Sequence, residues 1–182
     1  MYITIHIFAT MLSLTQMITS NPHINILFWI CYIIAIIVGT EIFAYIWHRY
    51  GAHSDYIPGI YDSHCIHHMS DLNLEHEADD DFVWILLIMI TCEIIIGIAV
   101  IIEFISGILA IITIIVSLVV LWWNWWIHKA YHRSDHWLNS YEWFRKEKER
   151  HYIHHYYSNN NYGIASHFTD KIMGTWFDPN IS

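Results

Sequence analysis

Ten of the fifteen histidines in this 182-residue chain lie in four short clusters, and their spacing could do chemistry. In HCIHH (64–68) and HYIHH (151–155), three histidines stand at i, i+3 and i+4, so a helix would project all three from one stripe. Such a stripe could hold a metal ion. The other two clusters hold two histidines each. The ten candidate ligands are His48, His53, His64, His67, His68, His128, His132, His151, His154 and His155.

The number of clustered histidines predicts two metal ions with four or five ligands each, because one structural zinc takes only four. Imidazole suits iron, zinc, copper and nickel alike, so ligand type alone does not choose the metal. Carboxylate-bridged iron pairs use Glu-x-x-His motifs, and no histidine here has a glutamate three residues before it. The His-Glu-x-x-His string of zinc proteases is also absent from the sequence. Bis-histidine haem is disfavoured because the histidines cluster at the ends of the apolar runs.

His48 and His53 are five residues apart, about 140° around an ideal helix, so both can reach one site only if the helix distorts. Gly51 lies between them and could permit the distortion. His136 continues the i, i+4 spacing of the third cluster, and we expect it to support the site or stand apart from it rather than to bind metal. We expect four further histidines not to bind metal: His6, His23, His76 and His167.

The elements that must position these clusters are predicted to be membrane-spanning helices. Hydrophobic residues make up 55% of the chain, and the apolar runs 26–47, 82–102 and 104–127 can each cross about 30 Å of hydrocarbon. Residues 1–19 are a fourth candidate, which we expect to be retained rather than cleaved as a signal peptide. The expected fold is all-α and integral to the membrane, with about four transmembrane helices in two hairpins and a histidine-rich helical cap. We expect one domain over residues 1–182.

The charged residues predict the orientation and exclude one class of partner. All eight lysines and arginines lie outside the apolar runs, on segments that also carry the histidines, so the positive-inside rule places the cap in the cytosol. The net charge of −9 and the acidic run 75–81 argue against nucleic acid. The three cysteines show no paired spacing typical of a disulfide framework or a zinc ribbon.

Polar residues inside the predicted spans are candidates for function because a charge in hydrocarbon is costly. Glu41 lies seven residues before His48, on nearly the same helix face, and could orient a ligand or meet a polar part of a substrate. Glu93 lies near the middle of its span without an identifiable partner. Asn124 lies four residues before His128 and is expected to accept the spare N–H of that ring. The tryptophans of 122–126 fit an interfacial aromatic belt.

The order His-x4-His, His-x2-His-His, His-x3-His, His-x2-His-His resembles the integral-membrane fatty acid hydroxylase superfamily, which includes sterol desaturases and carotenoid hydroxylases. The closing segment is also similar, with Asn161-Tyr162-Gly163-Ile164 followed by Asp170 and Gly174-Thr175. The resemblance covers roughly residues 40–177.

The resemblance implies a non-haem centre of two iron ions that uses O2 to hydroxylate an unactivated C–H bond of a lipid, such as a fatty acyl chain or sphingolipid. Desaturation of a lipid or sterol and carotenoid hydroxylation remain alternatives within the superfamily. A histidine-rich membrane protein that binds or transports metal is the alternative from another class. The sequence contains no cytochrome b5 domain, so we expect electrons from a separate protein such as cytochrome b5, a ferredoxin or a reductase.

Overall fold

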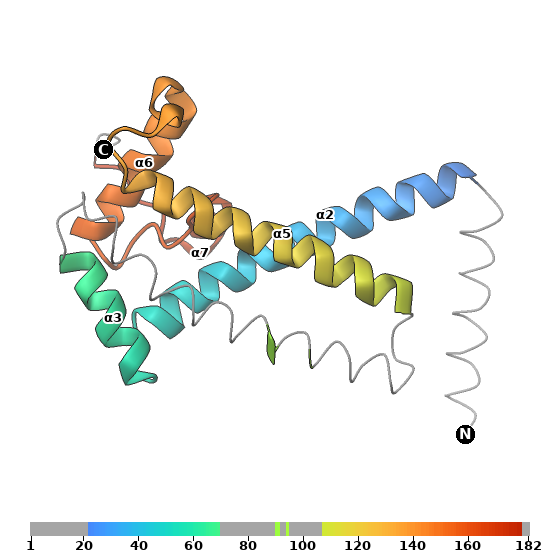
Figure 1. The fold of residues 1–182 in the computed structure, drawn as a ribbon, viewed down its shortest axis with the longest axis horizontal. Helices are drawn as coiled ribbons and strands as arrows, with labels where there is room; N and C mark the ends of the chain where they lie inside the picture. Colours follow the sequence, from blue (N-terminus) through green and yellow to red (C-terminus); the bar gives the residue numbers. More distant parts are fainter. Residues whose placement is uncertain (1–21, 70–89, 92–93, 95–106, 180–182) are drawn as a thin grey trace.

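The computed structural model describes residues 22–69, 90–91, 94 and 107–179, and the secondary structure within these ranges is helical throughout. Two long helices converge on a cluster of shorter elements (Figure 1). In chain order the elements are α2 (Pro22–Ile46), the π-helical turn η1 (Trp47–Ala52), α3 (Pro58–Met69), α5 (Gly107–Tyr131), the 3-10 turn η3 (Trp137–Ser140), α6 (Glu142–Tyr156) and α7 (Phe168–Met173).

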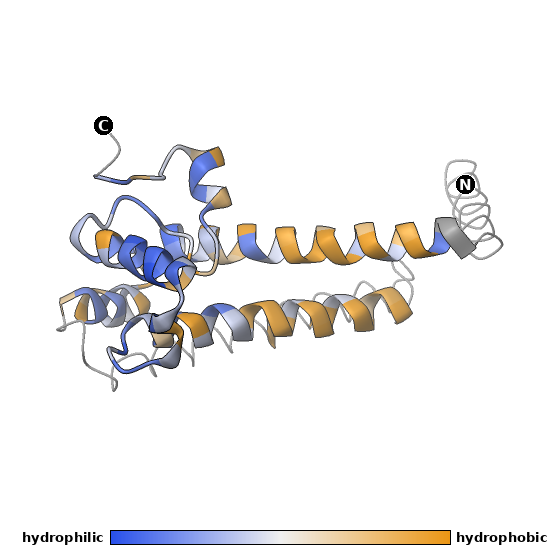
Figure 2. Cartoon of the chain, turned by 90° about the horizontal axis from the view of Figure 1, so that it is seen from above, coloured by the Kyte–Doolittle hydropathy of each residue, from blue (hydrophilic) through white to orange (hydrophobic). Residues whose placement is uncertain are grey.

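Helices α2 and α5 are the structural counterparts of two of the predicted spans. Each has 25 residues, which at about 1.5 Å per residue gives enough length to cross a bilayer. Both are long and apolar enough to span a membrane, counting α2 together with the turn that follows it. Both helices are hydrophobic along most of their length, as the colouring of Figure 2 shows. Many of their isoleucines and valines have exposed side chains. Such apolar surfaces need a lipid or protein environment.

Polar side chains link α2 to α5 at three levels. The Tyr32 hydroxyl lies 2.7 Å from Thr113 Oγ1, and Thr40 Oγ1 donates to Ser117 Oγ over 3.2 Å. Nearest the cap, Asn124 Nδ2 donates to Glu41 Oε1 over 2.7 Å. Hydrogen bonds between apolar helices help to fix their register when no water is present to compete.

The shorter elements form a cap at the end where both long helices finish, as Figure 1 shows. The buried residues Val120, Asn124, Ile127, His128 and Tyr131 form one stripe on α5, which faces the cap at the C-terminal end of the helix. Helix α6 is strongly charged and buries mainly Phe144, His151 and His154, whose spacing of seven and three residues keeps them on one face. The cap core contains Ile127, Ala130, Tyr131, Leu138 and Phe144.

The expectation of an all-helical chain with long apolar helices is confirmed for the described residues, in which two candidate spans are present. The other two predicted spans, 1–19 and 82–102, lie outside the described residues except for positions 90, 91 and 94. The acidic run 75–81 and Glu93 also lie outside them.

Candidate metal centres

The structure gathers all ten clustered histidines into two adjacent groups of five. Within each group, one ring nitrogen from every histidine lies within 4.8 Å of the others. The rings of His68 and His155, one from each group, stack with their centroids 4.4 Å apart, so the two groups are neighbours. Centre A contains His48, His53, His64, His68 and His154; centre B contains His67, His128, His132, His151 and His155.

Each of the two three-histidine clusters contributes to both centres. In α3, His64 and His68 belong to centre A, while His67 belongs to centre B. In α6 the division is reversed, because His151 and His155 belong to centre B and His154 to centre A. The single stripe therefore serves two sites rather than one. In both helices the i, i+4 pair stays together and the residue at i+3 turns to the neighbouring site.

The π-helical turn η1 brings His48 and His53 to the same centre. The backbone N–H of His53 donates to the carbonyl of His48 over 3.1 Å, which is the i→i+5 hydrogen bond of a π-helix. Residues five apart then lie about one turn apart and can share a site. A Cβ atom at Gly51 would lie 2.9 Å from the Trp47 ring, so this turn needs glycine there. The predicted distortion around Gly51 is confirmed.

The distances between ring nitrogens fit ligands around a six-coordinate metal ion. In centre A, His64 Nε2 lies 3.1, 2.9 and 3.1 Å from the Nε2 atoms of His48, His53 and His68. In centre B, His151 Nε2 lies 2.9 Å from that of His132 and 3.1 Å from that of His155. With metal–nitrogen bonds of about 2.1 Å, adjacent octahedral ligands lie about 3.0 Å apart and tetrahedral ligands about 3.4 Å apart. Five nitrogens per centre also exceed a tetrahedral set.

Hydrogen bonding among the rings cannot account for this arrangement. Nδ1–H of His48 donates to the Tyr162 carbonyl and that of His154 to the Asn160 carbonyl, each over 2.6 Å. In the neutral rings, both Nε2 atoms therefore carry lone pairs that face other imidazoles. His64 Nε2 touches three other Nε2 atoms but can carry at most one proton. A shared cation satisfies these converging lone pairs, so the residues fit a metal.

Burial favours the neutral form of several of these rings, which is the form that binds a metal ion. Burial lowers the pKa of His64, His151 and His154 well below the usual histidine value, and the neighbouring imidazoles lower it further. The same causes, burial first, lower the pKa of His53 and His155.

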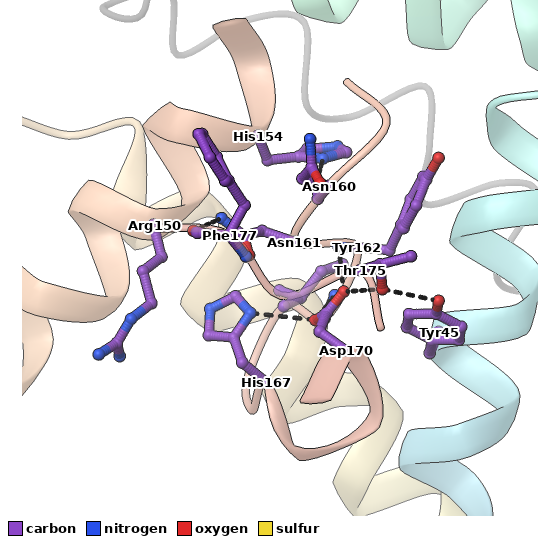
Figure 3. Close-up of polar contacts among 12 residues, drawn as sticks. Tyr45, Arg150, His154, Asn160, Asn161, Tyr162, His167, Asp170, Thr175 and Phe177 are labelled. Carbon is purple, nitrogen blue, oxygen red and sulfur yellow. Dashed lines mark hydrogen bonds and ion pairs between the residues drawn. The ribbon is translucent and has the colours of Figure 1, made fainter. Parts of the chain in front are cut away.

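The segment after α6, residues 157–177, lies beside centre A and includes α7; we call it the tail loop (Figure 3). Its hydrogen-bonded inner part is buried, whereas residues 157–159 and 171–174 are exposed. The carboxylate of Asp170, fully buried, accepts from the backbone N–H groups of Tyr162 and Gly163 over 2.8 Å each. It also accepts from Thr175 Oγ1 at 2.8 Å and contacts His167 Nδ1 at 3.1 Å. In the sequence, only the family resemblance marks this segment, and it gives these residues no specific role.

The remaining described histidines lie outside the two centres. His136 caps η3, where its Nδ1 accepts from Leu138 N over 3.3 Å, and its ring stacks near Phe144. His167 is buried between Asp170 and Glu147, whose Oε2 lies 3.1 Å from His167 Nε2. Burial alone would lower the pKa of His167, but these two carboxylates raise it above the usual value. His6 and His76 lie outside the described residues, as does the side chain of His23.

The expected contact between Asn124 and His128 is wrong. The Asn124 amide instead donates to Glu41 Oε1 over 2.7 Å and to the Val120 carbonyl over 3.0 Å, while its Oδ1 accepts from Ala165 N over 3.2 Å. Asn124 lies one turn before His128, but its Oδ1, the atom that would accept the ring N–H, accepts from Ala165 N instead. Its amide nitrogen, which cannot accept a hydrogen bond, donates to Glu41 on α2. Asn124 therefore connects the two long helices to the tail loop.

Two five-histidine centres at one end of long apolar helices define a membrane-type histidine-box metalloprotein. Residues 33–175, which include all ten histidines, match the family model described as Fatty acid hydroxylase. The chain belongs to this family, whose members are histidine-box diiron oxidoreductases, and it is an enzyme of that class. Comparisons with curated proteins and with solved structures give no match.

Proposed function

We propose that this protein is an O2-dependent diiron hydroxylase that acts on an unactivated C–H bond of a lipid. The observation that carries the proposal is the division of ten histidines into two groups of five, with nitrogens spaced as adjacent octahedral ligands. Each group would hold one iron ion through its five imidazoles. One coordination position per ion then remains open, as a catalytic site requires.

Two bound irons would supply the chemistry that reduces O2 and oxidises the lipid. One oxygen atom enters the C–H bond, and the other leaves as water with two protons and two electrons from an external donor. The protein's own part is to hold ten neutral imidazoles in fixed directions and to exclude water from them. Burial of His64, His128, His151 and His154 serves both purposes.

We further propose that the whole chain, residues 1–182, is one membrane-embedded domain with four spans and a cytosolic cap. Two long apolar helices that end at the same cap support this topology. Basic residues concentrate on the cap: Lys129, Arg133, Arg145, Lys146, Lys148 and Arg150 all follow the tryptophan-rich end of α5.

The proposed substrate is a lipid, because the family acts on lipids and the apolar helices lead directly to the two centres. A fatty acyl chain or a sphingolipid would reach the cap from the bilayer without crossing water. We propose a separate electron-transfer protein, such as cytochrome b5, a ferredoxin or a reductase, as the source of electrons.

Mass spectrometry of lipids from cells that make the protein, compared with cells that make His154→Ala, tests the proposed reaction. The fully buried His154 lies in centre A, so its loss should abolish the activity without preventing membrane insertion. A lipid that gains one oxygen atom only with the wild-type chain supports hydroxylation. A lipid that loses two hydrogen atoms would indicate desaturation instead of hydroxylation. If the lipids of the two kinds of cell are identical although an active reductase is present, both reactions are contradicted.

A further inference from the structure

We propose that the tail loop is a positioning device for centre A, in which Asp170 orients His48 and acts on it through a single peptide group. This inference rests on the proposed function, because it assumes that centre A binds a metal ion. It assigns to the tail loop a role in metal binding that does not require any of its residues to touch the metal.

One peptide group connects Asp170 to His48. The carbonyl of Tyr162 accepts Nδ1–H of His48 over 2.6 Å. The N–H of the same peptide group, which belongs to Gly163, donates to Asp170 Oδ2 over 2.8 Å. A carboxylate that accepts from one end of a peptide polarises the carbonyl at the other end. Histidine ligands usually donate their second N–H to a carboxylate or to a carbonyl. Here His48 donates to a carbonyl, and the peptide group of that carbonyl donates in turn to a carboxylate.

A second peptide group of the tail loop contacts His154, with a backbone carbonyl in place of the carboxylate. The Asn160 carbonyl accepts Nδ1–H of His154 over 2.6 Å, and the N–H of this peptide group, on Asn161, donates to the Thr175 carbonyl over 2.9 Å. Both histidines contacted in this way belong to centre A, although one comes from η1 and the other from α6. The tail loop thus fixes two rings that lie more than a hundred residues apart in the sequence.

The shape of the tail loop depends on two residues that tolerate few replacements. Asn161 has a positive φ of 54° and is almost fully buried, and its side chain bonds to both the N–H and the carbonyl of Phe177 over 2.8 Å each. Asparagine is among the few residues that adopt this conformation readily. At Gly163 a Cβ atom would lie 2.1 Å from the Ser166 carbonyl oxygen, so the chain passes too closely for any side chain.

Asp170 also ties the tail loop to the helix that carries His48. Thr175 Oγ1 donates to Asp170 Oδ1, and it therefore accepts from the Tyr45 hydroxyl, 2.9 Å away (Figure 3). Tyr45 lies three residues before His48 and accepts a hydrogen bond from Arg49 over 2.9 Å. Although burial raises the pKa of Asp170, its hydrogen bonds with His167, Gly163 and Thr175 hold it below the usual value. The ionised form that polarises the peptide is therefore favoured.

Iron(II) titration of the purified full chain under anaerobic conditions, with a competing chelator, tests this inference in two backgrounds. His132→Ala leaves centre A as the intact centre, and His48→Ala leaves centre B. Asp170→Asn places an amide group where the carboxylate accepts its hydrogen bonds. We expect it to weaken iron binding about 10–100-fold in the His132→Ala background and to change it little in the His48→Ala background.

Thr175→Val provides a second, nearly isosteric variant in case Asp170→Asn fails to fold. It removes the hydroxyl between Tyr45 and Asp170 and should weaken centre A in the same direction by a smaller factor. Asn159→Ala, at an exposed position of the same loop, is the matched control and should change neither centre.

Equal weakening in both backgrounds would overturn the inference, because Asp170 would then support the whole cap rather than the centre that the tail loop contacts. Unchanged binding in both backgrounds would overturn it as well. If the unsubstituted protein bound no iron, the proposed function itself would fail, and this inference with it. Failure of the inference alone is recognised by two irons in the unsubstituted chain and no selective loss at centre A.

Discussion

Centre A and centre B contain the same number of histidines but are built in different ways. Centre B takes His128 from the end of α5, His132 from the turn that follows it, and His151 and His155 from α6, so i, i+4 spacing supplies four of its five members. Centre A needs a π-helical turn to bring His48 and His53 together, and backbone carbonyls of the tail loop contact two of its rings. Regular helices thus supply most of one site, while irregular backbone completes the other.

This difference implies that different kinds of substitution should remove metal binding at the two centres. Centre B packs against the cap core, where the Tyr131 ring lies 5.4 Å from that of His151, so it should persist as long as α5 and α6 remain docked. Centre A combines two local backbone features with strict requirements at Gly51 and Gly163. Substitutions that leave the helices intact can therefore remove centre A alone.

The largest effect is expected when one buried ligand is removed from either centre. Both His154→Ala and His151→Ala should lower lipid oxidation by more than about 100-fold, because even residues that only support a ligand contribute about 10–100-fold. Product formation per enzyme in membranes supplied with a reductase measures this. His136→Ala, outside both centres, is the control and should remain active. Full activity of His151→Ala would show that centre B is not needed for lipid oxidation.

Gly163→Ala should destabilise the tail loop severely, since its Cβ would lie 2.1 Å from the Ser166 carbonyl oxygen and 2.7 Å from Asp170 Oδ2. We expect a loss of about 3 kcal/mol in stability and of metal at centre A. Gly39→Ala in α2 is the matched control, because its Cβ would meet nothing within 4 Å. Thermal unfolding in detergent compares the two variants. Similar unfolding temperatures would contradict the described packing of the tail loop.

Gly51→Ala should disturb the π-helical turn without affecting α5 or α6. The added Cβ would press on the Trp47 ring at 2.9 Å and shift His53 relative to His48. We expect about tenfold weaker metal binding at centre A, roughly 1.4 kcal/mol. Combining Gly51→Ala with Trp47→Leu removes much of the clash and should restore part of the affinity, as measured by iron(II) titration. Equal weakening at centre B would show that the turn supports both sites.

The metal-free protein should lose stability as the pH falls below about 6.5, the value for an unfolded histidine. Burial and neighbouring rings lower the pKa of His64, His151 and His154 in the folded state, so only the unfolded chain takes up these protons. Each such histidine lowers stability by up to about 1.4 kcal/mol per pH unit. His167, whose pKa is raised, acts with the opposite sign and stabilises the fold at low pH.

Thermal unfolding of chelator-treated protein between about pH 5 and 8 measures this dependence, with the iron-loaded protein as the control. Bound iron should protect the rings from protons and flatten the curve. An unfolding temperature that rises on acidification would contradict the burial of the neutral rings.

The smallest effect is expected on the outer face of α6. Lys146 and Glu142 form an exposed ion pair at 2.6 Å, and such pairs contribute little. Lys146→Ala should leave the unfolding temperature and the iron content of both centres unchanged. A loss of iron would show that the outer face of α6 affects the metal centres.

The sequence allowed prediction of the histidine clusters, the helices over 26–47 and 104–127 and the distortion near Gly51, because each leaves a regular signal in residue type and spacing. The division of each three-histidine cluster between two centres could not be predicted. A stripe about 100° wide can face one ion or straddle two, and the choice depends on which other helices pack against it.

The tail loop escaped prediction for a different reason. Backbone carbonyls contact His48 and His154, and a carbonyl is present at every residue, so the sequence carries no direct signal of its use. The residue types of Asn161, Gly163 and Asp170 can be read from the sequence. Their roles cannot, because these depend on contacts that form only when the tail loop packs beside centre A. The contact expected for Asn124 is wrong for the same reason, because the backbone N–H that bonds to its side-chain oxygen belongs to Ala165, 41 positions away.

The most direct test of the two-centre arrangement is the iron content of the anaerobically purified chain and of two single variants, one for each centre. The structure predicts two irons in the wild-type protein, one in His154→Ala and one in His151→Ala, each from the unaltered centre. Loss of all iron from either single variant would indicate one shared site, and the absence of iron from the wild-type protein would contradict the diiron assignment.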